Sequence, residues 1–354
     1  MNIDKSKPVM VTGATGYVAG WIVKRLLEEG LTVHAAVRQP QNKEKLKYLD
    51  AVAEDTPGTI KYFKADLMDN GSYADAMKGC QIVFHTASPF FLNVKDPQKE
   101  LVEPAVFGTQ NVLEEANKTA SVTRVVLTSS CAAIYGDNKD LESKPSGKFT
   151  EEDWNTTSSL KHQPYYYSKT LAEKEAWKIC QAQERWDMVV INPSFVLGPG
   201  VNPFGTSESF TVIKQMGDGT AKAGAPNWNL GVIDVRDLAE AHLKAAFVPE
   251  AQGRYIISAR GSSFPEIAAI LREHFGNKYP FPKKVLPKAL VWMFGPILNP
   301  ALTRKSISCN INYRWDADNS KGIKDLGMKY RPFKESVVDF FQQMIDNGYF
   351  EKAK

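Results

Sequence analysis

The fold is decided by a short stretch near the N-terminus, Val9-Met10-Val11-Thr12-Gly13-Ala14-Thr15-Gly16-Tyr17-Val18-Ala19-Gly20. Its first four residues form an apolar run typical of a buried strand, and glycines follow at once. The pattern of residues 21–27 predicts an amphipathic helix that ends at Gly30, and Thr32 to Val37 reads as a second strand. A strand, a glycine-rich turn, a helix and a strand within about thirty residues predict a dinucleotide-binding βαβ unit.

The same alternation of strand and helix continues along the chain. Near-continuous apolar strands separated by helices indicate a parallel sheet that is covered on both faces. We therefore expect an α/β fold with a Rossmann-type doubly wound parallel sheet. The further strands are predicted at residues 60–63, 82–85, 125–128 and 188–191, and the longest helices at 103–119 and 168–183.

The composition of the sequence changes after Pro193, where glycine and proline become frequent and the predicted helical segments are shorter. This change predicts a smaller, interleaved C-terminal domain that holds the substrate. We assign residues 1–195 to the cofactor domain, with 231–258 returning to it because two segments there resemble strands. Residues 196–230 and 259–354 then form the smaller domain.

Composition excludes several classes of protein. The chain has 354 residues, 43% hydrophobic and 24% charged, as in an ordinary globular protein. Its net charge of +4 comes without a long basic block, which argues against a nucleic-acid partner. Four isolated cysteines and scattered histidines give no metal-ligand spacing, so no metal is expected. The isolated thiols and the lack of an apolar leader after Met1 predict a cytoplasmic location. We expect a monomer or homodimer.

One apolar segment, residues 289–298, is flanked by Lys283-Lys284 and Arg304-Lys305. It is too short and too interrupted by proline to span a bilayer, so no transmembrane segment is predicted. Three interpretations stay open. The segment forms a lid or wall over an apolar pocket, a core helix of the smaller domain, or a shallow contact with a membrane.

The glycine-rich turn predicts the phosphate site. Gly13 and Gly16 let the backbone approach a pyrophosphate, which would rest on the positive N-terminus of the first helix. A tight turn without a ligand gives the same letters, but its position between the first strand and first helix favours a cofactor. The residues expected to contact the cofactor here are Gly13, Thr15, Gly16, Tyr17 and Val18.

The second strand indicates which dinucleotide is bound. An NAD site places an acidic residue at the end of this strand to bind the ribose 2′-hydroxyl. Here the strand ends at Arg38, with Lys45 seven residues later. Two cations suit a 2′-phosphate, so NADP(H) is expected, although both could be solvated loop charges. Asp66 and Leu67, after the third strand, are expected to meet the adenine.

A tyrosine and a lysine stand at helical spacing in Tyr165-Tyr166-Tyr167-Ser168-Lys169, 35 residues after Ser129-Ser130. Residues i and i+4 share one face of a helix. At an effective dielectric near 20, a lysine charge about 4 Å away contributes at most roughly 4 kcal/mol, which could lower the pKa of the phenol. Such a phenol could act as a general acid. Taken alone, the pair is equally consistent with surface residues.

Six motifs together resemble one family, the extended short-chain dehydrogenase/reductases. Its dihydroflavonol 4-reductase, cinnamoyl-CoA reductase and microbial ketone and aldehyde reductase branch is the most similar. The motifs are Thr12-Gly13-x-x-Gly16-x-x-Ala19, His85-Thr86-Ala87-Ser88-Pro89, Leu127-Thr128-Ser129-Ser130, Tyr165-x-x-x-Lys169, Asn192-Pro193-Ser194 and Ile233-Asp234-Val235-Arg236-Asp237.

The resemblance implies a Ser-Tyr-Lys catalytic set. Ser130 would bond the substrate carbonyl, with Ser129 the alternative, because spacing alone does not separate the two. Tyr165 would donate the proton, and Lys169 would lower its pKa and bind the nicotinamide ribose. Arg38 and Lys45 match the residues that hold the 2′-phosphate. The remaining cofactor contacts implied by the resemblance are Ala87, Ser88, Thr128, Pro193 and Val196.

Departures from the family pattern concern the substrate. The flavonoid enzyme has Asn or Asp where this chain has Tyr135, and the cinnamoyl-CoA branch has a different run around the catalytic tyrosine. Phe107 replaces an asparagine that many members carry. The overall pattern of the sequence is most similar to that of microbial reductases of small ketones and aldehydes. Aromatic residues near the motifs predict a small apolar or aromatic carbonyl substrate; they are Phe90, Phe91, Tyr135, Tyr166, Phe204 and Trp228.

The leading hypothesis is an NADPH-dependent carbonyl reductase that converts an aldehyde or ketone to an alcohol, with Tyr165 as proton donor. One alternative is a nucleotide-sugar epimerase or dehydratase on the same scaffold, although no second phosphate site is evident after residue 200. Another is a non-catalytic NADP-binding regulator. Such regulators typically lose the tyrosine or the lysine, and this chain keeps both.

Overall fold

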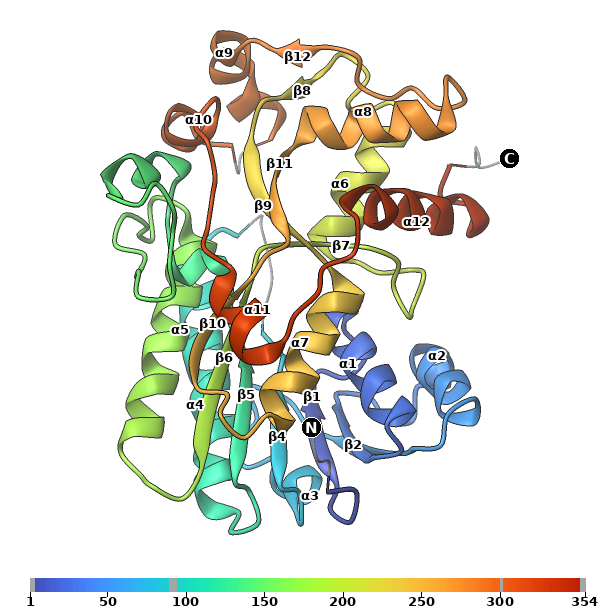
Figure 1. Cartoon of the computed structure of the whole chain (residues 1–354), viewed down its shortest axis with the longest axis vertical. Coiled ribbons are helices and arrows are strands. Elements are labelled where there is room, and N and C mark those ends of the chain that lie inside the picture. The colour runs from blue at the N-terminus through green and yellow to red at the C-terminus, as the bar shows by residue number, and fades with distance from the viewer. Residues whose placement is uncertain (1–3, 89–93, 300–301, 351–354) are drawn as a thin grey trace.

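The computed structural model describes residues 4–88, 94–299 and 302–350. Its centre is a parallel sheet of seven strands in the order β10-β6-β5-β4-β1-β2-β3 (Figure 1). This is the Rossmann order with one strand added, so the predicted doubly wound sheet is confirmed. The strands are β1 Val9–Thr12, β2 Thr32–Val37, β3 Thr59–Lys64, β4 Ile82–His85, β5 Arg124–Thr128, β6 Asp187–Pro193 and β10 Gly253–Ile257.

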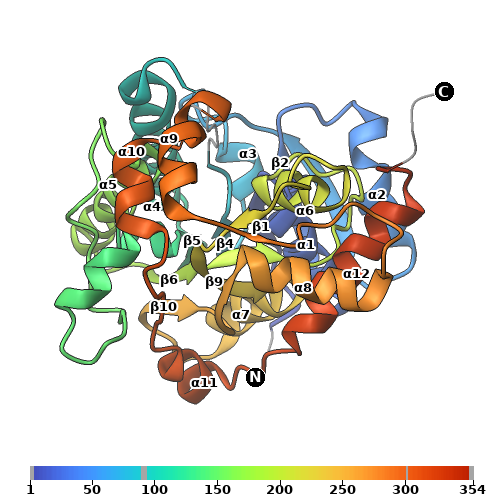
Figure 2. The ribbon, with the colours of Figure 1, turned by 90° about the horizontal axis from the view of Figure 1, so that it is seen from above.

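Alternating side chains of the strands build two cores, one on each face of the sheet. Val9 and Val11 point into the core under α1 Tyr17–Glu28, α2 Lys43–Glu54 and α7 Val235–Phe247. Met10 points into the core on the other face. The two layers of helices stand on opposite sides of the strands in Figures 1 and 2. The second layer comprises α3 Ala74–Met77, α4 Glu103–Lys118 and α5 Pro164–Gln181, with the π-helical turn η1 Gln98–Val102 before α4.

A smaller region covers the end of the sheet at which the strands terminate. It contains a three-stranded sheet in the order β11-β9-β7 and a two-stranded sheet of β12 and β8. Its strands are β7 Phe195–Leu197, β8 Ala225–Pro226, β9 Asn229–Asp234, β11 Arg260–Ser263 and β12 Val285–Leu286. Its helices are α6 Glu208–Gly217, α8 Phe264–Phe275, α9 Lys288–Leu298, α10 Arg304–Asn310 and α12 Phe333–Asp346.

The segment expected to return to the cofactor domain is divided between the two regions. β9 pairs with β7 and β11 in the small sheet, whereas α7 packs on α1 and β10 extends the large sheet. α11 Ser320–Leu326 packs near β10 and α7, so part of the last third of the chain also lies on the large sheet. The exchange of segments in both directions is the interleaving that the sequence predicted. No helix in the described ranges is long and apolar enough to cross a bilayer.

Candidate active site

The turn between β1 and α1 forms a cradle. Gly13 has φ +61°, and a Cβ built on it would lie 3.0 Å from the Cβ of Ala87, so a side chain there would collide with the loop after β4. Gly16 caps α1 without a side-chain hydrogen bond, which leaves N–H groups of the first turn available to an anion. This geometry fits a dinucleotide pyrophosphate.

Thr12 joins the two loops of the cradle, a role that the sequence did not reveal. Its Oγ1 accepts hydrogen bonds from the N–H groups of Thr86 and Ala87, each at 3.0 Å. It lies 3.1 Å from Nδ1 of His85. Burial and the charge of Lys169 lower the pKa of His85 to about 3, so the ring is neutral. The carboxyl ends of β1 and β4 are therefore held together at the point where the strand order reverses.

Arg38 and Lys45 both lie exposed beside this cradle. Arg38 follows β2 directly, and all four residues of β1 pair with β2. Lys45 stands in the first turn of α2, which Asn42 caps by accepting the N–H of Lys45 at 3.2 Å. Within residues 4–88, 94–299 and 302–350, neither side chain forms an ion pair, so both are available to a ligand phosphate.

Hydrogen bonds from α4 fix the segment that is expected to meet the adenine. Asn111 of α4 donates from its side chain to the carbonyls of Leu67 at 3.1 Å and Asp69 at 2.8 Å. The carboxylate of Asp66 accepts a hydrogen bond from the backbone N–H of Met68. Leu67 lies close to Gly108: a Cβ built on Gly108 would lie 3.0 Å from the Leu67 side chain. Asn111 is a second positioning residue that the sequence analysis missed.

The three expected catalytic residues meet at the first turns of α5. Tyr165 and Lys169 share a face of this helix, and the lysine Nζ lies 5.7 Å from the centre of the tyrosine ring. Ser130, just after β5, hydrogen-bonds to the Tyr165 phenol and also accepts the N–H of Ala132. Lys169 lines a cavity with other motif residues. They are His85, Ala87, Ser88, Thr128 and Ser129.

The neighbouring serine has a different environment. The Ser129 hydroxyl is buried and donates a 2.5 Å hydrogen bond to Oε2 of Glu173. Its backbone N–H bonds to Ile191 of β6. Adjacent residues leaving a strand point to opposite sides, which spacing in the sequence alone could not assign. The structure thus directs Ser130, and not Ser129, toward Tyr165.

The electrostatics differ from the simple expectation for a Tyr-Lys pair. Burial raises the pKa of Tyr165 above that of an ordinary phenol, and the hydrogen bond with Ser130 only partly offsets this. Burial also lowers the pKa of Lys169 to about 8, against the carboxylate of Glu173, which raises it. The pKa of the phenol is therefore not lowered overall, because the cost of desolvating a phenolate dominates.

Glu173 lies beneath the cavity and is fully buried. It accepts hydrogen bonds from Ser129, from Asn192 at 2.8 Å and from Arg254 at 2.6 Å. The sequence analysis missed it, although its position four residues after Lys169 on the same helix face was a usable signal. The paired carboxylate fixes the segments that carry both serines, because Asn192 also bonds the Ser130 carbonyl.

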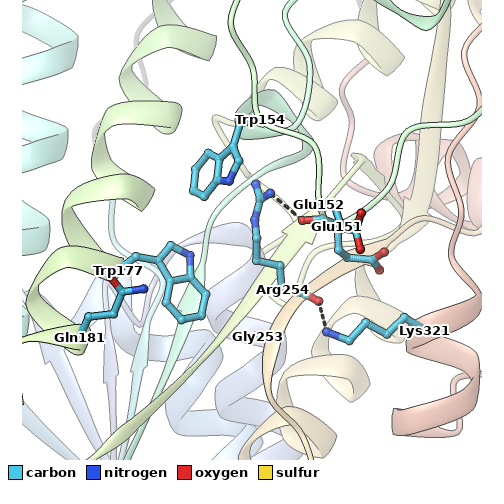
Figure 3. A pocket seen from close by; sticks show the side chains of 8 residues that line it. All are labelled: Glu151, Glu152, Trp154, Trp177, Gln181, Gly253, Arg254 and Lys321. Carbon is cyan, nitrogen blue, oxygen red and sulfur yellow. Dashed lines mark hydrogen bonds between the residues drawn. The ribbon is translucent and has the colours of Figure 1, made fainter. Parts of the chain in front are cut away.

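Arg254 reaches this carboxylate from a shallow surface pocket on the far side of α5. Figure 3 shows its guanidinium between Trp154 and the Glu151 backbone. Its carbon Cζ lies 4.0 Å from the centre of the Trp154 ring. Its N–H groups donate to the carbonyls of Glu151, Asp153 and Ala133, and to Glu173. The pocket is therefore lined by Arg254, whose ion pair with Glu173 is buried behind it. It is separate from the cavity that Lys169 lines.

Thr128 and the residues expected on the nicotinamide side lie at the same end of the sheet. The Thr128 hydroxyl lies 2.7 Å from Nε2 of His242, whose Nδ1 donates to Leu238. Burial lowers the pKa of His242 to about 4, so this ring is neutral and accepts the threonine proton. Pro193 is the last residue of β6, and Val196 lies in β7 next to it. Both stand at the sheet end where the cradle lies.

The aromatic substrate candidates divide into separate groups. Tyr135 and Tyr166 hydrogen-bond to each other, and Tyr166 packs edge-on against Tyr165 with ring centres 6.1 Å apart. Phe204 instead stacks on Tyr349, and Trp228 packs under α9 and α10. Phe90 and Phe91 lie outside the described residues. Among those described, no cluster of His, Cys, Asp or Glu could hold a metal ion.

Comparison with known proteins agrees with this geometry. Residues 9–257 match the model of the NAD dependent epimerase/dehydratase family, which covers well over half of the chain. The chain belongs to this family. Membership confirms the predicted kinship with the extended short-chain dehydrogenase/reductases, and the matched region runs from β1 to the end of β10.

Its relatives in the epimerase/dehydratase family include plant reductases. A cinnamoyl-CoA reductase of Medicago truncatula is 39% identical over 268 residues, 75% of this chain and 80% of the relative. Tetraketide alpha-pyrone reductase 1 of Arabidopsis thaliana is 35% identical over 353 residues, 98% of each protein. Yeast methylglyoxal/isovaleraldehyde reductase, solved with NADPH, superposes with a TM-score of 0.75 at 27% identity, covering 97% of this chain and 99% of its own.

Proposed function

We propose that the protein is an NADPH-dependent reductase that converts an aldehyde or ketone to an alcohol. The observation that carries this proposal is the meeting of Ser130, Tyr165 and Lys169 beside the cavity next to the dinucleotide cradle. The oxidoreductase class and the NADP(H) cofactor are further supported by the reductases among its relatives and by the neighbour solved with NADPH.

Each residue has a defined part in the reaction. Bound NADPH supplies a hydride to the carbonyl carbon. Ser130 donates a hydrogen bond to the carbonyl oxygen, where negative charge develops. Tyr165 transfers its proton to that oxygen, so that hydride and proton together give the alcohol. The ammonium of Lys169 stabilises the phenolate until solvent protonates it again.

The cofactor would lie across the carboxyl ends of the strands. The turn before α1 would hold the pyrophosphate, and Arg38 and Lys45 would bind the 2′-phosphate by charge-assisted hydrogen bonds. Asp66 and Leu67 border the adenine. Ala87 would lie beside the pyrophosphate and ribose, Ser88 would be a further cofactor contact, and Pro193 and Val196 would hold the nicotinamide carboxamide. These assignments rest on the family resemblance, and the positions of the residues around the cradle support them.

The substrate we propose is a small apolar or aromatic carbonyl compound. Support comes from the ring of Tyr166, which lies against Tyr165 and is the aromatic wall that we propose for the substrate; Tyr135 contacts Tyr166 but is buried against Phe149 in the core. The contacts of Phe204 and Trp228 lie elsewhere, so we leave them out of this wall. A cytoplasmic location and a monomeric or homodimeric state stay predictions.

A steady-state panel tests the reaction. Aliphatic aldehydes, aromatic ketones, 2-oxoaldehydes, dihydroflavonols and UDP-sugars would be offered with NADPH, and the loss of NADPH absorbance recorded. We expect oxidation of NADPH with apolar aldehydes or ketones. Isomerisation of a UDP-sugar with no net loss of NADPH would instead identify an epimerase and overturn the proposal.

A further inference from the structure

The strongest unexplained feature of the molecule is the exposed apolar surface of α9. Twelve large hydrophobic side chains are exposed among the described residues, and seven of them lie within residues 285–298. We call six of these the α9 face: Leu290, Trp292, Met293, Phe294, Ile297 and Leu298. Ile297 and Leu298 are 77% and 83% exposed, the highest values of the twelve. Clustered exposure of this kind marks a binding surface.

The helix is anchored from its opposite side only. Val291 and Gly295, one turn apart, face α10, and a Cβ on Gly295 would lie 3.2 Å from the Ile307 side chain. Lys288 ties the start of α9 to the Ser308 carbonyl at 2.8 Å. α9 and α10 lie side by side in both views of the molecule (Figures 1 and 2). The interpretation of residues 289–298 as a core helix is therefore wrong, because most of the helix is apolar yet exposed.

The charged residues near the α9 face indicate which kind of partner it binds. Residues 275–315 contain seven lysines and arginines and no aspartate or glutamate. The whole chain carries +4, so all other residues together carry −3. Lys283, Lys284, Arg304 and Lys305 are exposed, and Arg304 lies over the Trp292 ring at 4.8 Å. The segment that carries the α9 face is therefore cationic along its sequence, and the acidic Asp137 and Asp140 approach it beside Cys309 of α10.

We propose that α9 docks the protein on an anionic phospholipid surface, with the α9 face entering the interfacial layer. An exposed apolar helix face with a tryptophan and a fringe of lysine and arginine is the composition of helices that lie in a membrane interface. Each basic residue near an anionic leaflet adds to the attraction. A second copy of the chain fits less well, because a symmetric contact through this face would bring like charges together.

Vesicle flotation tests the proposal on the full-length protein. Vesicles of phosphatidylcholine are compared with an equimolar mixture of phosphatidylcholine and phosphatidylserine. We expect binding to the mixed vesicles, weaker binding to the neutral ones, and loss of binding at high salt because screening shortens the reach of the lysines.

Two double variants separate the apolar and charged contributions. Ile297→Ser with Leu298→Ser should weaken vesicle binding by at least about 30-fold, since both side chains lose their favourable transfer out of water. Lys283→Gln with Lys284→Gln should weaken it about 30-fold, at about fivefold for each lysine. Ile323→Ser with Lys324→Gln on α11, where Ile323 is 46% exposed, is the matched control and should leave binding unchanged.

Because the four substituted α9-region residues are exposed, the variants should retain wild-type turnover without vesicles. Three outcomes would overturn the proposal. The wild type fails to float with either vesicle, or the apolar variant floats as well as the wild type. The third is that Ile297→Ser with Leu298→Ser changes the KM for a carbonyl substrate or the oligomeric state while flotation persists, which would identify a lid or a second copy instead.

Discussion

Arg254 donates a 2.6 Å hydrogen bond from Nε to Oε1 of Glu173, and both side chains are almost entirely buried. Arg254 lines a surface pocket (Figure 3), and Glu173 lines the separate cavity that Lys169 and Ser129 also line. Glu173 also accepts hydrogen bonds from Ser129 and Asn192, and its carboxylate raises the pKa of Lys169. A network of this kind positions catalytic groups without touching the substrate.

Breaking this buried pair should destabilise the fold. Arg254→Met leaves the Glu173 carboxylate buried without its partner, which costs about 3–5 kcal/mol in the free energy of unfolding. Urea denaturation followed by circular dichroism measures it. Arg314→Met, which removes a largely exposed ion pair with Asp316, should cost less than about 1 kcal/mol. Equal losses for both variants would show that burial of the Glu173 pair is unimportant.

Loss of the proton donor should separate catalysis from cofactor binding. Tyr165→Phe is expected to lower kcat by at least about 10²-fold, because the only lost atom is the phenolic oxygen. NADPH affinity, measured by fluorescence titration, should change little. Tyr167→Phe is the matched control on the same turn. If Tyr165→Phe retained wild-type turnover, the proton donor would have to be another group.

The two serines should respond differently. Ser130→Ala removes the hydrogen-bond donor proposed for the carbonyl oxygen and should lower kcat by about 10²–10³-fold. Ser129→Ala removes a hydrogen bond to the buried Glu173, so stability should fall by about 1–3 kcal/mol. Steady-state kinetics and urea denaturation of both variants check this. A larger kcat loss in Ser129→Ala than in Ser130→Ala would reverse the assignment.

Arg38 should decide between the two dinucleotides. Arg38→Asp places a carboxylate where the 2′-phosphate would lie, so NADPH should bind far more weakly while NADH binds as well or better. The ratio of kcat/KM for the two cofactors is the measurement. Lys47→Ala, which removes an exposed cation of the same helix that pairs with Glu44, should leave the ratio unchanged. An unaltered preference in Arg38→Asp would remove Arg38 from the phosphate site.

The rate should depend on pH through Lys169. Its ammonium is charged below a pKa of about 8 and neutral above it, whereas the raised pKa of Tyr165 keeps the phenol protonated. We expect kcat/KM for reduction to fall as pH rises through about 8. Glu173→Gln removes the charge that raises the lysine pKa, so the midpoint should move to lower pH. Glu175→Gln, whose carboxylate bonds Gln110 of α4 at 2.9 Å, is the control, and an identical profile in all three proteins would contradict this role for Glu173.

Much of the site could be predicted because it is encoded locally. The turn at Gly13 and Gly16, the cation after β2 and the four-residue spacing of Tyr165 and Lys169 depend on backbone geometry and helical periodicity. Both properties are readable over a few residues. The strands were predictable for the same reason, since a parallel sheet buried on both faces needs continuous apolar runs.

Only the tertiary structure decided which groups share one environment. It directed Ser130 rather than Ser129 to the phenol, joined Arg254 to Glu173 across 81 residues of sequence, and left the α9 face uncovered. It also decided the pKa of Tyr165, because desolvation depends on everything packed around the ring. The sequence by itself determined the family, the sheet and the cofactor turn, since these follow from local pattern. Burial and long-range partners arise only when distant segments pack together.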